Sequence, residues 1–172
     1  MTYVMSDIHG NYEKFKEMLE ESKKNLIQSA RKTRTEESSF DTNDLPDEID
    51  LAVMDLSFIS LRLILPAVYG LLKDHGQAVC LVKPQFEAGR EKVGKKGVVR
   101  DPAVHVEVLE DFLVYSREAG FSLLGLDFSP IRGPEGNIEY LGFLSAGQGE
   151  SWSGDLKSIV EESHAHLEGE HH

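Results

Sequence analysis

Apolar residues occur along the chain in short uninterrupted runs, and these runs alternate with stretches in which apolar residues recur at helical spacing. Strands that alternate with helices predict an α/β fold with a mostly parallel sheet and helices on both faces. A short turn rich in glycine and proline joins the last two runs, so these two strands are expected to form an antiparallel C-terminal hairpin. The predicted strands are Thr2–Ser6, Asp50–Asp55, Ala78–Val82, Phe121–Phe128 and Ile138–Leu144.

The stretches between these runs carry the signals of helices. After the first strand and a short turn, apolar residues recur at helical spacing over residues 12–19. Ser60 is a good N-cap and predicts a helix that continues through Leu72. Asp101, a second good N-cap, is followed by a proline, which fits the first helical position, and Gly120 suits the left-handed end of that helix.

The polar residues predict how these elements are organised. A length of 172 residues favours one domain, which we expect over residues 1–146. Within it, residues 1–35 form an atypical strand–loop–helix and residues 36–49 form a polar, acidic loop. Residues 147–172 are polar and carry one further helical pattern, which predicts a tail with a short helix.

Composition and charge narrow the class of protein. The sequence contains no apolar run of the ~18 residues that a membrane span needs, so no membrane association is expected. The single cysteine, Cys80, lies in an apolar run and predicts a buried core thiol in a cytoplasmic protein. A net charge of −12 argues against nucleic-acid binding by the whole surface. Residues 90–100 are the exception, with one acid and five basic residues: Arg90, Lys92, Lys95, Lys96 and Arg100.

Three charged residues lie at or next to ends of the predicted strands. Asp55 ends one strand, Lys83 follows the next, and Glu139 enters the last. Open α/β sheets bind their ligands at the carboxyl ends of strands. A charge beside an apolar strand is costly unless it is paired or solvated, so the three side chains are expected to meet. A lysine whose pKa is lowered by burial can deprotonate a hydroxyl group.

The segments around these three residues carry a family resemblance. The run Lys83–Glu91, which reads KPQFEAGRE, is the most specific match, and Gly97–Pro102 and Gly133–Glu139 support it. Through these motifs, residues 44–145 resemble the C-terminal part of TlyA/hemolysin-A proteins, an FtsJ-like group of ribose 2′-O-methyltransferases that act on ribosomal RNA.

The resemblance implies a catalytic set, a cofactor and a partner. The family uses Lys, Asp, Lys and Glu, and Asp55, Lys83 and Glu139 match the last three of these. It implies that Lys83 acts as the base toward the ribose hydroxyl and that the two acids hold it. It further implies S-adenosylmethionine as cofactor, ribosomal RNA as partner, and contacts between RNA phosphates and the basic residues of 90–100.

The sequence departs from the family pattern in its cofactor half. The family's first lysine precedes the first strand, where this sequence has only Met1 and Thr2. A Gly-rich loop of the kind that approaches the methionine part of the cofactor is also not found. Cofactor-binding residues are therefore unassigned, and we expect weak or no binding of S-adenosylmethionine. A catalytically inactive methyltransferase-like domain, acting as a non-catalytic interaction domain, is an open alternative.

The first residues carry a second resemblance. Residues 1–20 are similar to the opening of a calcineurin-like metallophosphoesterase, which implies that Asp7 and His9 are candidate metal ligands. A two-metal site needs further ligands from later loops, and the sequence motifs that supply them are not found. A metal-dependent phosphoesterase is thus a further alternative. A sheet edge left open by the missing strand also predicts self-pairing into a homodimer.

Overall fold

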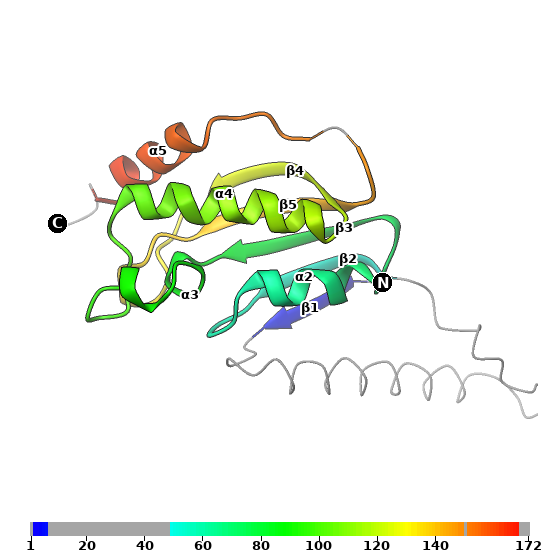
Figure 1. Cartoon of the computed structure of the whole chain (residues 1–172), viewed down its shortest axis with the longest axis horizontal. Helices are drawn as coiled ribbons and strands as arrows, with labels where there is room; N and C mark the ends of the chain where they lie inside the picture. Colours follow the sequence, from blue (N-terminus) through cyan, green and yellow to red (C-terminus); the bar gives the residue numbers. More distant parts are fainter. Residues whose placement is uncertain (1, 7–48, 150, 169–172) are drawn as a thin grey trace, which may run out of the picture.

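A computed structural model describes residues 2–6, 49–149 and 151–168, and the fold of this part is α/β (Figure 1). One mixed sheet has the strand order β1-β2-β3-β5-β4. The strands are β1 (Thr2–Ser6), β2 (Ile49–Asp55), β3 (Leu72–Val82), β4 (Phe121–Phe128) and β5 (Tyr140–Ala146). The helices are α2 (Leu61–Tyr69), α3 (Pro84–Glu87), α4 (Pro102–Glu118) and α5 (Leu156–Glu168), with 3-10 turns η1 (Arg90–Lys92) and η2 (Pro134–Gly136).

The direction of the strands decides which residues meet at one edge. β1 pairs with β2 and β2 with β3 in parallel, whereas β5 runs antiparallel to both β3 and β4. The predicted antiparallel pairing of the last two strands is therefore confirmed. Because β5 runs against its neighbours, its beginning lies at the same edge as the ends of β2 and β3.

Helix α2 is shorter than predicted and β3 is longer. The helix ends at Tyr69, not at Leu72, because the backbone N–H of Gly70 caps it by donating to carbonyls of the last turn. β3 then begins at Leu72, six residues before the predicted start. The early part of this strand carries exposed polar residues, and Lys73 pairs with Asp50 of β2. A search for apolar runs misses the first part of β3, because its residues are mostly polar.

The other boundaries agree with the prediction or differ by a little. β4 has the predicted bounds, and Asp101 caps α4 by accepting a hydrogen bond from the amide of Ala103 at 2.9 Å. Gly120 follows the helix with φ +100, the left-handed conformation expected of it. The last strand begins at Tyr140, so Glu139 precedes β5 and does not lie within it.

The described helices form one layer against the sheet, in which α4 contacts both α2 and α5 (Figure 1). The predicted helix over residues 12–19 lies outside the described residues, so the expectation of helices on both faces stays a prediction. The segment from residue 147 on, expected to be a polar tail with a short helix, includes the 13-residue α5. Val160, Ser163 and Leu167 of this helix are buried.

The core lies between the sheet and this helical layer. Gly142 of β5 allows α4 to approach closely, because a Cβ at this position would meet the ring of Phe112 at 2.6 Å. Cys80 is fully buried as predicted, and burial raises the pKa of its thiol. None of the described helices is long and apolar enough to cross a membrane. The innermost side chains are Ala52, Met54, Ile64, Leu65, Val68, Ala78, Cys80, Val82, Leu109, Phe112, Tyr140 and Leu144.

Candidate active site

Neighbouring parallel strands place Asp55 and Lys83 together. Asp55 is the last residue of β2 and Lys83 follows the last residue of β3. The Lys83 Nζ lies 2.6 Å from Asp55 Oδ1 and also donates to Ser57 Oγ at 3.3 Å. The lysine side chain is only 8% exposed, whereas the Asp55 side chain is 58% exposed. The pair therefore combines a buried ammonium with a carboxylate that faces solvent.

Glu139 reaches the same edge from the antiparallel strand. The pairing of Val82 with Tyr140 brings the residue before β5 beside the residue after β3. Glu139 is 4% exposed, and burial raises the pKa of its carboxyl, while Lys83 opposes that rise and Asp55 adds to it. No ion pair within 4.0 Å joins Glu139 to Lys83 in the described part of the chain. The three predicted residues thus form one electrostatic cluster, with direct contact only between Asp55 and Lys83.

Gln85 is a member of the cluster that sequence reasoning missed. Its Nε2 donates to Glu139 Oε1 at 2.8 Å, so it fixes the carboxyl that Lys83 does not touch. Its own Oε1 is buried without a hydrogen-bond partner among the described residues. The available signal was the alternation of polar residues in the run from Lys83 to Glu87, since each of the three polar residues binds a different partner.

The turn before β5 is shaped around Glu139. A Cβ on Gly133 would lie 2.2 Å from Glu139 Oε1, so only glycine leaves room for this carboxyl. The turn continues through Glu135 and Gly136, both at positive φ, to the buried Asn137. Gly133 of this motif therefore leaves the space that the Glu139 carboxyl occupies.

The basic loop, residues 90–100, lies next to this turn. Asn137 Nδ2 donates to the carbonyl of Gly97 at 2.9 Å, and its Oδ1 accepts from the amide of Val99 at 3.1 Å. A shallow cavity of 330 Å³ opens on the loop. All five predicted RNA contacts are exposed, and Lys92, Lys95, Lys96 and Arg100 line this cavity whereas Arg90 does not.

His105 attaches the basic loop to the core from the other side. Its Nε2 lies 2.9 Å from the carbonyl of Val99, and its Nδ1 lies 2.7 Å from the hydroxyl of Tyr140. Because a carbonyl can only accept, Nε2 carries the proton and Nδ1 accepts from Tyr140. Tyr140 also contacts Ser163 Oγ of α5 at 3.1 Å, so α5 is joined to the same network.

The loop between Asp55 and α2 carries an exposed aromatic residue in a strained conformation. Phe58 has φ 63 and is 62% exposed, and its ring centroid lies 4.9 Å from that of Phe86. Residues other than glycine in this region cost energy and cluster at functional sites. An apolar surface of two rings thus flanks the Asp55–Lys83 pair.

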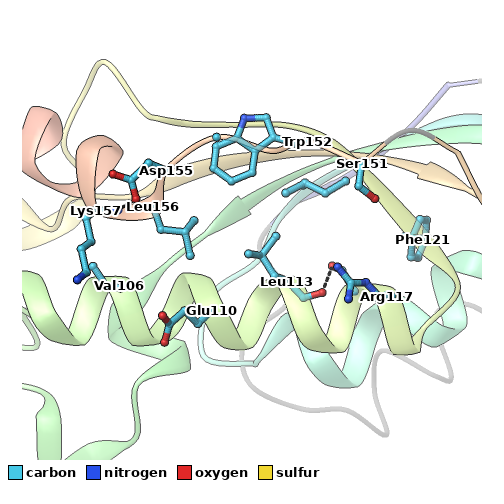
Figure 2. Close-up of a pocket in the computed structure, with 13 residues that line it drawn as sticks. Val106, Glu110, Leu113, Arg117, Phe121, Ser151, Trp152, Asp155, Leu156 and Lys157 are labelled. Carbon is cyan, nitrogen blue, oxygen red and sulfur yellow. Dashed lines mark hydrogen bonds between the residues drawn. The ribbon is translucent and has the colours of Figure 1, made fainter.

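A second cavity lies elsewhere. This cavity has a volume of 310 Å³ and lies between α4 and residues 151–157. Figure 2 shows its lining residues, among them Trp152, Leu113 and Arg117. It shares no residue with the charged cluster. Trp152 and Leu156, which begins α5, line this cavity together. Among the described residues, no group of three or more His, Cys, Asp or Glu suits a metal ion, and Asp7 and His9 lie outside them.

Comparison with known proteins identifies the family. The model of the FtsJ-like methyltransferase family matches residues 4–145 of this chain. The chain therefore belongs to the FtsJ-like methyltransferases. Within them, its relatives place it in the TlyA/hemolysin A family of rRNA 2′-O-methyltransferases.

Three curated relatives and one solved structure support this placement. The chain is 49% identical over 123 residues to "Putative rRNA methyltransferase YqxC" of Bacillus subtilis (strain 168), covering 69% of this chain and 44% of that protein. It is 44% identical over 96 residues to the 16S/23S rRNA (cytidine-2′-O)-methyltransferase TlyA of Mycobacterium tuberculosis (strain ATCC 25618 / H37Rv), covering 56% of this chain and 36% of TlyA. It is 41% identical to hemolysin A of Brachyspira hyodysenteriae over 55% of this chain and 40% of that protein.

The solved structure titled "Putative hemolysin from Streptococcus thermophilus" superposes with a TM-score of 0.70 at 34% identity, over 98% of this chain and 68% of that one. The chain spans less than half the length of the curated relatives it matches. The family match begins at residue 4 and so includes the stretch that resembles a phosphoesterase.

Proposed function

We propose that the cluster of Asp55, Lys83 and Glu139 is the catalytic centre of a ribose 2′-O-methyltransferase that acts on ribosomal RNA. The observation that carries the proposal is the buried Lys83 Nζ, 2.6 Å from a half-exposed carboxylate at the carboxyl edge of the sheet. Such an edge is where open α/β sheets bind their substrates. The relatives named as rRNA (cytidine-2′-O)-methyltransferases supply the reaction and the class of RNA.

Each residue of the cluster has a distinct part in this reaction. Lys83 in its neutral form accepts the proton of the ribose 2′-hydroxyl while the hydroxyl oxygen takes up the methyl group. Asp55 then stabilises the ammonium that forms on Lys83 Nζ. Glu139 adds negative potential from the position before β5, and Gln85 Nε2 holds its Oε1 by a hydrogen bond of 2.8 Å. Together these groups position and deprotonate a hydroxyl, which is general base catalysis.

The residues at this edge fit a sulfonium cofactor. When bound, S-adenosylmethionine supplies the methyl group as a sulfonium cation. Ser6 at the end of β1 pairs with Asp55 in the register of the sheet, so β1 and β2 end at the same edge. The exposed carboxylate of Asp55 provides a negative charge there, which favours a cation. We assign no other described residue to the cofactor, because the chain that follows Ser6 lies outside the described part.

The surroundings of the cluster suit a single nucleotide of an RNA chain. The basic loop supplies exposed cations for phosphates, and hydrogen bonds through Asn137 keep it beside the turn that carries Glu139. The rings of Phe58 and Phe86 offer an apolar surface next to Lys83, and proteins bind unpaired RNA bases by stacking on such rings.

Transfer of a tritium-labelled methyl group from S-adenosylmethionine to ribosomal RNA tests the proposal. We expect incorporation at a ribose 2′-oxygen, a loss of at least about 100-fold on Lys83→Ala, and a clear loss on Glu139→Gln. Lys73→Ala is a matched control, because Lys73 lies near the start of β3, at the opposite end of the strand from Lys83, is exposed and pairs with Asp50. Incorporation that survives Lys83→Ala would overturn the assignment.

Calorimetry with S-adenosylmethionine separates the catalytic function from a non-catalytic one. Binding supports the enzyme. No binding at millimolar cofactor, together with binding of ribosomal RNA that depends on the basic loop, would instead show a non-catalytic RNA-binding domain. The observation that favours this second function is that the sequence shows no Gly-rich loop for the methionine part of the cofactor.

A further inference from the structure

The carboxyl group of Glu87 joins the two loops that carry Asp55 and Lys83. Glu87 is the last residue of α3, four positions after Lys83. Its Oε2 accepts a hydrogen bond from Ser60 Oγ at 2.7 Å and its Oε1 accepts from the amide of Leu61 at 2.8 Å. Ser60 and Leu61 end the loop that begins after Asp55 and start helix α2.

These contacts make Glu87 part of the helix cap of α2. The first N–H groups of a helix have no partner within it, and a negative charge is favourable at this end of the helix dipole. Ser60 Oγ accepts a hydrogen bond from the amide of Arg62 at 3.2 Å and donates its own hydroxyl hydrogen to Glu87 Oε2. The carboxylate thus satisfies a helix amide directly and orients the hydroxyl that satisfies a second one.

Burial of this carboxylate has a cost that a surface cap would avoid. Desolvation raises the pKa of Glu87, and the hydrogen bonds from Ser60 and Leu61 oppose that rise. The hydroxyl of Tyr115 is buried close enough to affect the pKa of Glu87, but it makes no complete hydrogen bond within the described part of the chain. An exposed Asp or Ser could cap the first amides of α2 without this desolvation of a buried carboxylate.

The geometry connects this costly cap to the lysine. Lys83 Nζ is held by Asp55, which ends β2, and by Ser57, which lies on the short loop between β2 and Ser60. The loop is anchored at one end by β2 and at the other by the bonds to Glu87. Between these ends stands Phe58 in its strained conformation, which persists only where the surroundings enforce it. Glu87 is on the chain segment of Lys83 itself, so it fixes the loop relative to the lysine.

We propose that Glu87 is a positioning residue of the methyl-transfer site, which holds the loop of residues 56–60 so that Asp55 and Ser57 stay in hydrogen-bond range of Lys83 Nζ. This inference rests on the proposed function of Lys83. In the motif KPQFE, the alternate polar residues then have one task each. Lys83 faces the substrate, Gln85 holds Glu139, and Glu87 holds the partners of Lys83.

A structural cap without a role at the site would give a different pattern of effects, and a matched cap elsewhere provides the control. Asp155 caps α5 by accepting from the amides of Lys157 and Ser158 at 3.2 and 3.3 Å. Asp155→Ala also removes a carboxylate that caps a helix, and Asp155 contacts no residue of the cluster. Glu87→Ala removes both anchoring bonds, and Glu87→Gln keeps an oxygen that can accept from the amide of Leu61.

The experiment measures the loop and the lysine in the full chain without cofactor or RNA. Amide hydrogen exchange of Leu61 reports the anchor, and the NMR titration of the Lys83 ε-carbon against pH reports its surroundings. In Glu87→Ala we expect Leu61 to exchange at least about 10-fold faster and the Lys83 titration to shift. Glu87→Gln should recover part of both effects, and Asp155→Ala should change neither.

Methyl transfer to ribosomal RNA is the second readout. For Glu87→Ala we expect kcat to fall about 10- to 100-fold, because misplacing catalytic groups by an ångström has effects of this size. The KM for RNA should change less than about threefold. The carboxyl group of Glu87 binds Ser60 and Leu61, and the proposal gives it no contact with RNA. A folded Glu87→Ala protein with wild-type exchange at Leu61 and wild-type titration of Lys83 overturns the proposal. If that variant does not fold, the same readouts on Glu87→Gln decide.

The two proposals fail in different ways. A wild-type protein without methyl transfer contradicts the proposed function, while the exchange and titration measurements still decide the role of Glu87. Normal methyl transfer that Lys83→Ala abolishes and Glu87→Ala leaves intact contradicts only the positioning role.

Discussion

Asn137 binds Val99, 38 positions earlier in the chain, and this single side chain connects the turn before Glu139 to the basic loop. The Asn137 Oδ1 accepts from the amide of Val99 at 3.1 Å, and the Nδ2 donates to the carbonyls of Gly97 and Pro134 at 2.9 and 3.1 Å. Asn137 is 3% exposed. These hydrogen bonds therefore hold the proposed RNA-binding loop against the turn that carries the proposed catalytic carboxylate.

Asn137→Ala is expected to destabilise the protein and to weaken RNA binding. The substitution leaves the buried amide of Val99 without a partner, which costs about 1–3 kcal/mol. Asn137→Asp keeps the acceptor and loses both donors, so we expect an intermediate effect. Thermal unfolding and filter binding measure the two quantities. Gln77→Ala, which removes an exposed amide from β3, is the control, and equal stability of Asn137→Ala and Gln77→Ala would contradict the prediction.

The basic loop itself is expected to give RNA binding a salt dependence. Lys95→Ala combined with Lys96→Ala removes two exposed charges that line the loop cavity. Each phosphate contact with single-stranded RNA contributes about −0.7 to the slope of log K against log salt, so the double variant should lose up to twice that slope. Lys157→Ala, an exposed lysine beside the cavity of Figure 2, should leave the slope unchanged. An equal loss from Lys157→Ala would mean that RNA binds through overall charge.

Much of the fold follows from local patterns that tertiary contacts do not override. β4 and the start of α4 are read correctly because an apolar run and an Asp–Pro cap each determine their element locally. The early half of β3 is missed because Lys73 and His75 look like loop residues. This part of β3 is set by its pairing with β2, in which Ile49 pairs with Leu72 and Leu51 pairs with Gln77. The register shift between these two pairs cannot be predicted from the local sequence.

The candidate site divides in the same way. Strand ends and motifs point to Asp55, Lys83 and Glu139, because a charge beside an apolar strand is visible in the sequence. The partners of these residues are not visible. Gln85 and Glu87 lie in the short helix α3, and their partners are distant in the chain: Glu139 before β5, and Ser60 and Leu61 at the start of α2.

Gly133→Ala is expected to damage the site through Glu139. The added methyl group would lie 2.2 Å from Glu139 Oε1, so the buried carboxyl or the turn has to shift. Overpacking of this kind costs about 1–3 kcal/mol, and the displaced carboxyl should also lower methyl transfer. Gly149→Ala is the matched control, because its nearest heavy atom would be at 3.9 Å. Differential scanning fluorimetry and the tritium assay measure both effects, and a Gly133→Ala protein with full stability and activity would refute the account of this turn.

His105 is expected to make the attachment of the basic loop sensitive to acid. Burial is the main cause that lowers the pKa of its imidazole, the nearby His164 lowers it further, and the bond to the Val99 carbonyl and the charge of Asp101 oppose this. A histidine whose pKa is lower in the folded state takes up its proton more readily when unfolded. Its contribution to stability is therefore complete above the unfolded pKa near 6.5 and is lost as pH falls below that value.

We expect the melting temperature of the wild-type protein to fall between pH 7.5 and pH 5, and His105→Gln to reduce the part of this change that histidine causes. Glu87 and Glu139 act in the opposite direction, because a raised carboxyl pKa adds stability as pH falls. The informative quantity is therefore the difference in stability between wild type and His105→Gln at each pH. That difference should be largest near pH 7.5, where the neutral ring makes both of its hydrogen bonds, and should shrink toward pH 5. A difference that is constant with pH would show that His105 keeps the same protonation state across this range and contributes through packing alone.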